Sequence, residues 1–281
     1  SYLHGETGQV MRFEDPTTAP TLFEVDDEGL VKRVTKPLGG VTEITYDSEG
    51  SRRSRGNALV VAVTADDRGD NGSAHTLTTF YEYEGYSNQL TRITDPRSAV
   101  TQIVRNEVGL PKEITEALGA PEAGTTKFDY NDFGQPTKVT NPNLHVTTYD
   151  YFATGPSRGY LQKQTVDPGG LGLETVYETD ARGNLKSVTD PRGVRHESTY
   201  NEVDWLVETI AAASAAIDGS GAPALNLKTT YLHDENGNVL EERIPFGDDG
   251  TRFTRVQRDY GVLNEVKQTR SEVTPGAADF V

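Results

Sequence analysis

Two acidic clusters are the best candidates for binding chemistry in this sequence. Residues 66–72 read Asp-Asp-Arg-Gly-Asp-Asn-Gly, and residues 234–238 read Asp-Glu-Asn-Gly-Asn. Calcium prefers several such oxygen ligands around a tight glycine turn. Neither cluster completes an EF-hand loop, because Arg68 stands where an oxygen is needed and no bidentate Glu is correctly placed. We therefore expect solvated turns in both places, with no metal and no other cofactor.

Neighbouring carboxylates could also supply the acid and base of a glycoside hydrolase. The obvious groups, Asp26-Asp27-Glu28 and Asp248-Asp249, lie where reverse turns are expected, and Asp favours turns for backbone reasons. No HExxH, GxSxG or GxxxxGK motif occurs. The five histidines are His4, His75, His145, His196 and His233. His4 and His233 lie in equivalent Tyr-Leu-His contexts, and His145 and His196 lie on expected second strands, so the repeat favours structural roles. No catalytic residue is predicted, and we expect a protein that is not an enzyme.

Two further features have a functional and a structural interpretation. The tripeptide Arg68-Gly69-Asp70 could contact an integrin-like receptor, but the composition of this polar loop already favours it. The single tryptophan, Trp205, could form a platform for sugar stacking. Because large aromatic side chains usually pack, a wedge between repeats is the favoured interpretation of Trp205.

Composition limits the classes of partner and site that this chain can have. The 43 acidic residues outnumber the 27 basic ones, for a formal net charge of −16, which disfavours nucleic acid because phosphate binding needs Lys and Arg. There is no cysteine, so disulfides and cysteine-based zinc sites are excluded. No apolar run reaches 18 residues, so no membrane-spanning helix is expected. Thirteen tyrosines suit a sheet with at least one wetted face.

An internal repeat explains where these candidates lie. A turn-type residue recurs along the chain, at Gly8, Gly29, Gly50, Asn88, Gly109, Gly134, Gly159, Gly183, Asp204, Gly237 and Gly261. Eight of the ten steps between these positions measure 21 to 25 residues. A fixed period of this size indicates a repeat architecture in which each unit needs its neighbours.

Each period is predicted to be a β-hairpin. Short strands with β-branched residues lie between Gly-Asn turns and Asp-Pro-x-Gly turns, as from Gly183 to Tyr200. The residues that define the repeat are the turn glycines Gly29, Gly50, Gly134, Gly183 and Gly237, the turn prolines Pro37, Pro96, Pro142 and Pro191, and the strand tyrosines Tyr46, Tyr130, Tyr177 and Tyr200. Pro245 is also expected between strands, since proline cannot donate to a ladder.

One irregularity remains open at this point. Leu185 and Val188 are three residues apart and would face opposite sides of a regular strand. A bulge, a strong twist or two partly buried faces would each account for this spacing.

The repeats predict one continuous domain over residues 1–281, built as a curved antiparallel sheet. Loop insertions are expected near residues 65–75 and 210–223, where recognition would most plausibly occur.

The repeat resembles the YD repeat of the RHS family. The segment Tyr177–Gly193 carries the resemblance, and Tyr46-Asp47-Ser48-Glu49-Gly50 and Tyr130–Gly134 match its opening. The dipeptides Asp15-Pro16, Asp95-Pro96 and Asp167-Pro168 match its close. The resemblance implies a strip of β-sheet that forms part of a hollow shell around a C-terminal toxin cargo.

The expected function follows from this resemblance. The chain would be a structural segment of a shell in a longer, secreted or cell-surface bacterial protein, with the remaining repeats and the toxin cargo as partners. The alternative is an extracellular adhesion or glycan-binding array that acts through its insertion loops, with a cell-surface or glycan ligand. A carbohydrate-active enzyme that uses turn carboxylates is the weakest interpretation.

Overall fold

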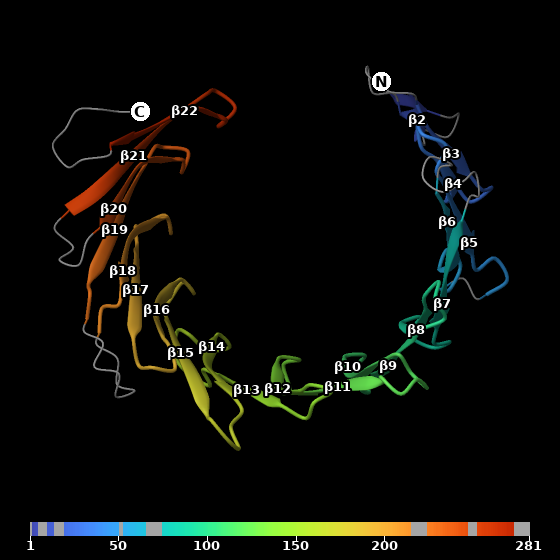
Figure 1. The fold of residues 1–281 in the computed structure, drawn as a ribbon, viewed down its shortest axis with the longest axis horizontal. Helices are drawn as coiled ribbons and strands as arrows, with labels where there is room; N and C mark the ends of the chain where they lie inside the picture. Colours follow the sequence, from blue (N-terminus) through green and yellow to red (C-terminus); the bar gives the residue numbers. More distant parts are fainter. Residues whose placement is uncertain are drawn as a thin grey trace. The chain divides into compact units, whose positions relative to one another are not determined.

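The computed structural model describes residues 2–4, 10–13, 20–50, 53–65, 75–214, 224–246 and 252–272. These residues form strands and turns and no helix, so the expected all-β fold is confirmed (Figure 1). The strands are β1 (Tyr2–His4), β2 (Val10–Phe13), β3 (Thr21–Val25), β4 (Val31–Thr35), β5 (Val41–Tyr46), β6 (Ala58–Thr64), β7 (Thr76–Tyr83), β8 (Leu90–Thr94), β9 (Val100–Arg105), β10 (Pro111–Glu116), β11 (Gly124–Tyr130), β12 (Pro136–Thr140), β13 (Val146–Tyr151), β14 (Leu161–Val166), β15 (Leu173–Thr179), β16 (Leu185–Thr189), β17 (Arg195–Tyr200), β18 (Leu206–Ala211), β19 (Leu227–His233), β20 (Val239–Phe246), β21 (Arg252–Tyr260) and β22 (Val266–Glu272).

The chain divides into two compact units, residues 1–135 with 139–144 and residues 136–138 with 145–281. In the first unit, β1 to β11 pair antiparallel in sequence order, each strand with the next. In the second unit, β13 to β22 do the same. Both units are therefore meanders of consecutive hairpins, and the organisation of residues 1–281 as a single domain stays a prediction.

Within each unit, successive hairpins reverse at two edges. We call one the turn edge; it includes the turns at residues 26–30, 84–89, 106–110, 131–135, 180–184, 201–205, 234–238 and 261–265, and the longer turns at 47–57 and 152–160. The opposite loop edge alternates short turns at 36–40, 95–99, 141–145 and 190–194 with longer connections at 65–75, 117–123, 167–172 and 212–226. Both expected insertions belong to these longer connections, and residues 66–74 and 215–223 lie outside the described part of the chain.

A bulge recurs in the hairpins of the turn edge. Thr179 pairs with Leu185 and Glu178 pairs with Ser187, so one extra residue, Lys186, stands on the second strand. The same shift of register occurs in eight other hairpins that reverse at this edge. Because of the extra residue, Leu185 and Val188 point to the same face, which resolves their irregular spacing.

Most of the predicted turn residues adopt a left-handed backbone. At the turn edge this residue precedes the second strand, with φ between 60° and 93° at Gly29, Gly56, Asn88, Gly109, Gly134, Gly159, Gly183, Asp204, Gly237 and Asn264. Gly50 and Gly261 do not have a positive φ, and Gly56 and Asn264 take the left-handed position in their hairpins. At residues 47–57 a longer turn separates Gly50 from the second strand, and at 261–265 Gly261 takes the first position of the turn.

The prolines of the short turns lie at the loop edge. Pro37, Pro96, Pro142 and Pro191 each follow the first residue of a short turn, where a fixed φ is needed and no N–H is used. Pro245 differs from expectation, because it lies inside β20, paired with Phe253.

The sheet has two unlike faces within each unit. The tyrosine face carries Phe23, Val34, Ile44, Tyr46, Val61, Leu77, Tyr81, Tyr83, Ile93, Ile103, Ile114, Phe128 and Tyr130 in the first unit, and Tyr149, Tyr151, Val166, Tyr177, Val188, Tyr200, Tyr231, Val256 and Tyr260 in the second. The opposite charged face carries alternating acids and bases. Among the described residues, Val194 is the only buried hydrophobic side chain, at 7% exposure. These residues therefore form a single layer whose side chains pack sideways against their neighbours on the same face.

Candidate functional site

The turn carboxylates are occupied by their own backbone. Asp26 Oδ1 accepts hydrogen bonds from the amides of Glu28 at 3.0 Å and Leu30 at 2.8 Å. In the second acidic cluster, Asp234 Oδ1 accepts from the amides of Asn236 and Asn238, both at 2.9 Å. Hydrogen bonds from the Asn238 side chain and from these amides hold the pKa of Asp234 below its ordinary value of 3.8. These geometries are those of Asx turns, in which the carboxylate stabilises the reversal of the chain.

The described residues contain no group of three or more His, Cys, Asp or Glu side chains that could hold a metal ion. The other acidic candidates, residues 66–72 and Asp248-Asp249, lie outside the described residues. His196 Nδ1 accepts a 3.4 Å hydrogen bond from the amide of Ala212, and the His233 ring lies 5.4 Å from the Trp205 ring. These two histidines thus make local contacts within the sheet.

The distinctive arrangement is instead a ladder of contacts between successive turns along the turn edge. Its first component is a tyrosine hydroxyl. Tyr46 donates to the Val31 carbonyl at 2.9 Å, and Tyr130 donates to the Pro111 carbonyl at 2.7 Å. Tyr83, Tyr151 and Tyr260 do the same toward Ala58, Pro136 and Val239. In each case the acceptor is the first residue of the second strand in the preceding hairpin, so the tyrosine links one repeat to the one before it.

The two remaining predicted tyrosines differ from each other in position. Tyr200 ends β17, as expected, opposite Leu206. Tyr177 lies two residues before the end of β15, and Thr179 takes the terminal place. The turn after β15 begins at Asp180, so the Tyr-Glu-Thr-Asp sequence puts two extra residues between tyrosine and turn. At position 105, an arginine replaces the tyrosine and donates to the Leu90 carbonyl at 3.1 Å.

The second component is the residue that follows each left-handed turn residue, which we call the follower. A step here means the passage from one turn of the turn edge to the next. In five such steps the follower has a large side chain, and the next turn has glycine at its left-handed position. A Cβ on Gly109 would lie 2.6 Å from Gln89 Nε2, and one on Gly237 would lie 3.0 Å from the Trp205 ring. A Cβ on Gly183 would overlap the Tyr160 hydroxyl, and Leu30 and Leu110 lie at 3.3 and 3.4 Å from the corresponding positions on Gly56 and Gly134. Trp205 is therefore a wedge between repeats, and its sugar-stacking interpretation loses support.

In three steps the follower is asparagine, and the next left-handed residue is Asn or Asp. Asn184 Nδ2 donates to Asp204 Oδ1 at 2.6 Å, and Asn238 Nδ2 donates to Asn264 Oδ1 at 3.0 Å. The side-chain amides of Asn57 and Asn88 hydrogen bond each other. A short polar follower thus leaves room for a side chain on the next turn and binds it, whereas a large follower requires glycine.

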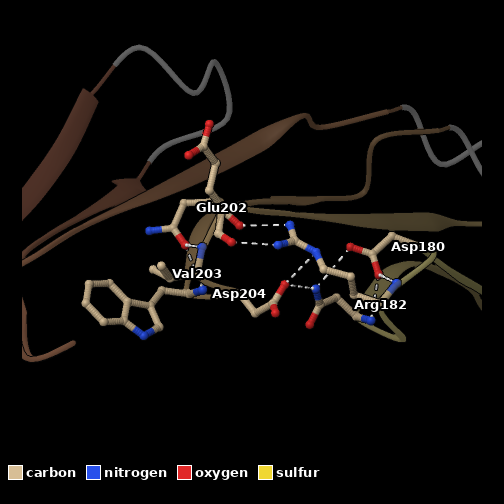
Figure 2. A network of polar contacts seen from close by, with 8 residues as sticks. Asp180, Arg182, Glu202, Val203 and Asp204 are labelled. Carbon is tan, nitrogen blue, oxygen red and sulfur yellow. Dashed lines mark hydrogen bonds and ion pairs between the residues drawn. The ribbon is translucent and has the colours of Figure 1, made fainter.

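An arginine strengthens one of these polar steps. Figure 2 shows Arg182 reaching the next turn, where it donates to the carbonyls of Glu202 at 2.6 Å and Asn201 at 3.1 Å. Its Nε lies 2.9 Å from Asp204 Oδ1. Arg53 likewise donates to the carbonyl of Tyr86 on the next turn, at 2.6 Å. These arginines donate charge-assisted hydrogen bonds to backbone carbonyls of the next turn.

The charged face carries a second kind of cross-strand link. Arg195 pairs with Glu178 and Glu197, both at 2.8 Å, and Lys163 pairs with Glu174 at 3.0 Å and Asp150 at 3.6 Å. The hydrogen bonds that Arg195 donates to Glu178 and Glu197 raise the pKa of its guanidinium above the ordinary value. Since these groups are largely exposed, each pair contributes little to stability.

Sequence reasoning missed Asn184, Arg182 and Asp204 as linking residues. A signal was present in the sequence, because each non-glycine residue at a left-handed position of the turn edge follows a hairpin with Gly-Asn at its turn. Gly56-Asn57 precedes Asn88, Gly183-Asn184 precedes Asp204, and Gly237-Asn238 precedes Asn264. The signal is a correlation between neighbouring repeats, which an analysis of single repeats does not reveal.

No protein-family model matches the chain. The probable deoxyribonuclease RhsB of Dickeya dadantii (strain 3937) is 26% identical over 212 residues, which cover 66% of this chain and 14% of that protein. A crystal structure of TcdB2-TccC3 superposes with a TM-score of 0.62 at 14% identity, covering 98% of this chain and 16% of that one. The Photorhabdus luminescens Tc holotoxin pore gives a TM-score of 0.54 at 13% identity, covering 98% and 19%.

The chain thus spans less than a fifth of the length of these relatives. Their names place them among Rhs and Tc toxin proteins, and the solved structures share the fold. None of the described segments is a helix with the length and apolarity needed to cross a bilayer. With the repeat residues and the consecutive antiparallel hairpins, these likenesses support an RHS-repeat protein, as the sequence resemblance predicted.

Proposed function

We propose that this chain is a non-enzymatic wall segment of an RHS-type β-shell that encloses a C-terminal toxin cargo in a longer parent protein. The parent would be a secreted or cell-surface bacterial protein. The partners of the segment would be the remaining repeats of the shell and the enclosed cargo.

The observation that carries this proposal is the single layer of sheet with two unlike faces. Most side chains on the tyrosine face are only half-buried, because the described residues include no layer that covers them. A globular domain would bury such a face against a second layer. A shell wall does not need a second layer, since it separates the enclosed guest from the solvent with one face toward the guest and the other toward the solvent.

The tyrosine face suits contact with a partly folded guest. Aromatic and aliphatic side chains give weak, non-directional attraction to exposed apolar segments of a guest. Tyrosine also has a polar tip, which limits the strength of that attraction. Such a face holds many sequences weakly and needs no specific pocket.

The relatives favour a structural role within a toxin-associated protein. The nuclease activity in the name of RhsB is said of a protein of which this chain spans only 14%. The TcdB2-TccC3 structures resemble nearly the whole of this chain in fold. This likeness in fold and the single-layer sheet together support a role as a wall segment.

The test compares two side chains on one strand. Leu77 and Phe80 both lie on β7, with 56% and 48% exposure, but Leu77 is on the tyrosine face and Phe80 on the charged face. We expect the full chain to bind reduced, carboxymethylated α-lactalbumin, a permanently unfolded protein, and to bind native lysozyme far less. Leu77→Ser should weaken this binding, whereas Phe80→Ser should leave it unchanged.

Binding is measured by fluorescence anisotropy, with a thermal melt of each variant as the control for folding. If Phe80→Ser weakened binding as much as Leu77→Ser, or if folded and unfolded proteins bound equally, the wall proposal would be wrong. Turnover of a glycoside substrate by the purified chain would also contradict it.

A further inference from the structure

We propose that three neighbouring turns at the turn edge form a docking surface for a basic amphipathic helix of another protein. The turns are residues 84–89, 106–110 and 131–135, all in the first unit. The proposal concerns the outer tips of these turns and does not rest on the function proposed above.

The tips present exposed apolar side chains in a row. Tyr86, Val108 and Phe133 lie at the tips of the three successive turns, with exposures of 86%, 78% and 73%. No turn geometry requires an apolar residue at such a tip, and polar residues are usual there. Most neighbouring turns carry polar tips, such as Glu28, Arg182 and Asn236. Three consecutive apolar tips therefore mark this stretch as different from the remainder of the edge.

Two grooves separate these tips. The first groove, of about 590 Å³, lies between the turns at 84–89 and 106–110 and is lined by Tyr86, Gln89 and Val108, among others. The second, of about 400 Å³, lies between the turns at 106–110 and 131–135 and is lined by Val108, Leu110 and Phe128, among others. Val108 borders both grooves, so tips and grooves form one continuous surface that could accept large side chains of a partner.

The charge of this surface selects a basic partner. Four carboxylates line the grooves, those of Glu84, Glu107, Asp129 and Asp132. Among the described residues, none of the four forms an ion pair with Lys or Arg. The grooves hold two basic residues, and Arg105 already donates to the carbonyls of Gly109 and Leu90. Apolar tips with an acidic excess favour a segment that combines apolar side chains with Lys or Arg.

The spacing of the turns selects a helix. Neighbouring turns on this edge are two strands apart, which is about 10 Å at about 4.8 Å per strand. Seven residues of an α-helix rise about 10.5 Å, so apolar side chains at positions i and i+7 would enter the two grooves together. In a β-strand, three residues span about 10 Å, but residues i and i+3 point to opposite sides. An amphipathic helix therefore matches the distance between the grooves and also directs both apolar side chains toward this surface.

The experiment uses the full chain and a labelled 21-residue helical peptide of three heptads, with Leu at the two core positions and Lys beside them. We expect binding by fluorescence anisotropy that weakens as salt is raised. Val108→Ser should reduce the affinity about tenfold, as for the central residue of an interface. Val203→Ser is the matched control, because Val203 is an apolar tip at 59% exposure between turns with polar tips, and it should leave the affinity unchanged.

Two further peptides test whether binding requires an apolar helix face and a positive charge. A peptide of the same composition with its Leu residues spread around the helix should bind at least about tenfold more weakly, as should a peptide with Glu in place of Lys. Equal binding of the shuffled peptide would show general attraction of cations and would overturn the proposal. Unchanged affinity of Val108→Ser would also overturn it, as would self-association of the chain that Val108→Ser abolishes, because a second copy would then be the occupant.

Discussion

The two edges of the sheet solve the same problem in different ways. At the turn edge, eight steps from one turn to the next are linked by side chains, five through a follower packed on glycine and three through an asparagine bound to the next turn. At the loop edge, short proline turns alternate with connections of up to 15 residues, as at 212–226. One edge therefore fixes the stacking of the repeats, while the other edge accepts insertions between them.

The largest expected difference between the edges is at two glycines with similar backbones. Gly183 has φ 93° at the turn edge and Gly39 has φ 90° at the loop edge. A Cβ on Gly183 would overlap Tyr160, whereas a Cβ on Gly39 would meet nothing within 4 Å. We expect Gly39→Ala to cost about 1–2 kcal/mol of unfolding free energy from backbone strain alone. Gly183→Ala should cost about 3 kcal/mol, because the overlap with Tyr160 adds to the strain.

Chemical denaturation of both variants measures this difference. Tyr160→Ser in the Gly183→Ala background should recover the part of the loss that comes from overlap. Equal losses for Gly39→Ala and Gly183→Ala would show that the turn edge is no more tightly packed than the loop edge.

A smaller effect is expected at a polar step of the turn edge. Asn184→Leu removes the hydrogen bonds that the Asn184 side chain donates to Asp204 and Asp180 and should cost about 1–2 kcal/mol, since each such bond contributes about 1 kcal/mol. Adding Asp204→Gly should restore most of this loss, since Leu30 and Leu110 already pack on glycine in other steps. A double-mutant cycle by denaturation measures the coupling between the two positions. Strictly additive effects would mean that the follower does not select the next turn residue.

The tyrosine hydroxyls are expected to contribute less. Tyr130→Phe removes the 2.7 Å hydrogen bond to the Pro111 carbonyl and should cost about 1 kcal/mol. Tyr81 is the control, because it lies on the same face and its hydroxyl makes no hydrogen bond within the described residues. Tyr81→Phe should therefore leave the melting temperature nearly unchanged. A loss at Tyr81 equal to the loss at Tyr130 would remove the linking role of the hydroxyl.

The smallest effects per residue are expected from titration. Burial raises the pKa of Tyr46, Tyr83, Tyr130 and Tyr151 above the ordinary value of 10.0. The unfolded chain then loses these protons first, so stability should fall as pH rises above about 10. Hydrogen bonds lower the pKa of Asp180 and Asp234 below 3.8, so their contribution should be lost as pH falls below about 4. Thermal melts across pH 2–12 check both limbs of this profile.

The sequence alone predicted the repeat and the hairpin in each repeat. It did so because turn chemistry is local: Asp190, Pro191 and Gly193 specify a reversal within five residues. The resemblance to YD repeats rested on the same residues. The shell function implied by that resemblance remains a proposal.

The bulge and the links between turns could not be predicted in the same way. The partner of Leu185 depends on the register between two strands, and no residue of the strand by itself reveals the extra Lys186. Gly50 has the spacing of the repeat, but the left-handed position belongs to Gly56 because that turn is longer. Tyr177 has the expected residue type, although two more residues follow it before the turn begins. In each case the missing information was a count of residues between strand and turn.

A cysteine pair tests the contact between successive turns most directly, because the natural chain has no cysteine. Asn184→Cys with Asp204→Cys replaces side chains that lie in hydrogen-bond contact at 2.6 Å. Mild oxidation should link this pair rapidly, as seen by mass spectrometry after proteolysis. The control pair, Asn184→Cys with Asn238→Cys, joins turns that are one hairpin further apart and should remain reduced. Equal rates of linkage for the two pairs would contradict the stacking of turns described above.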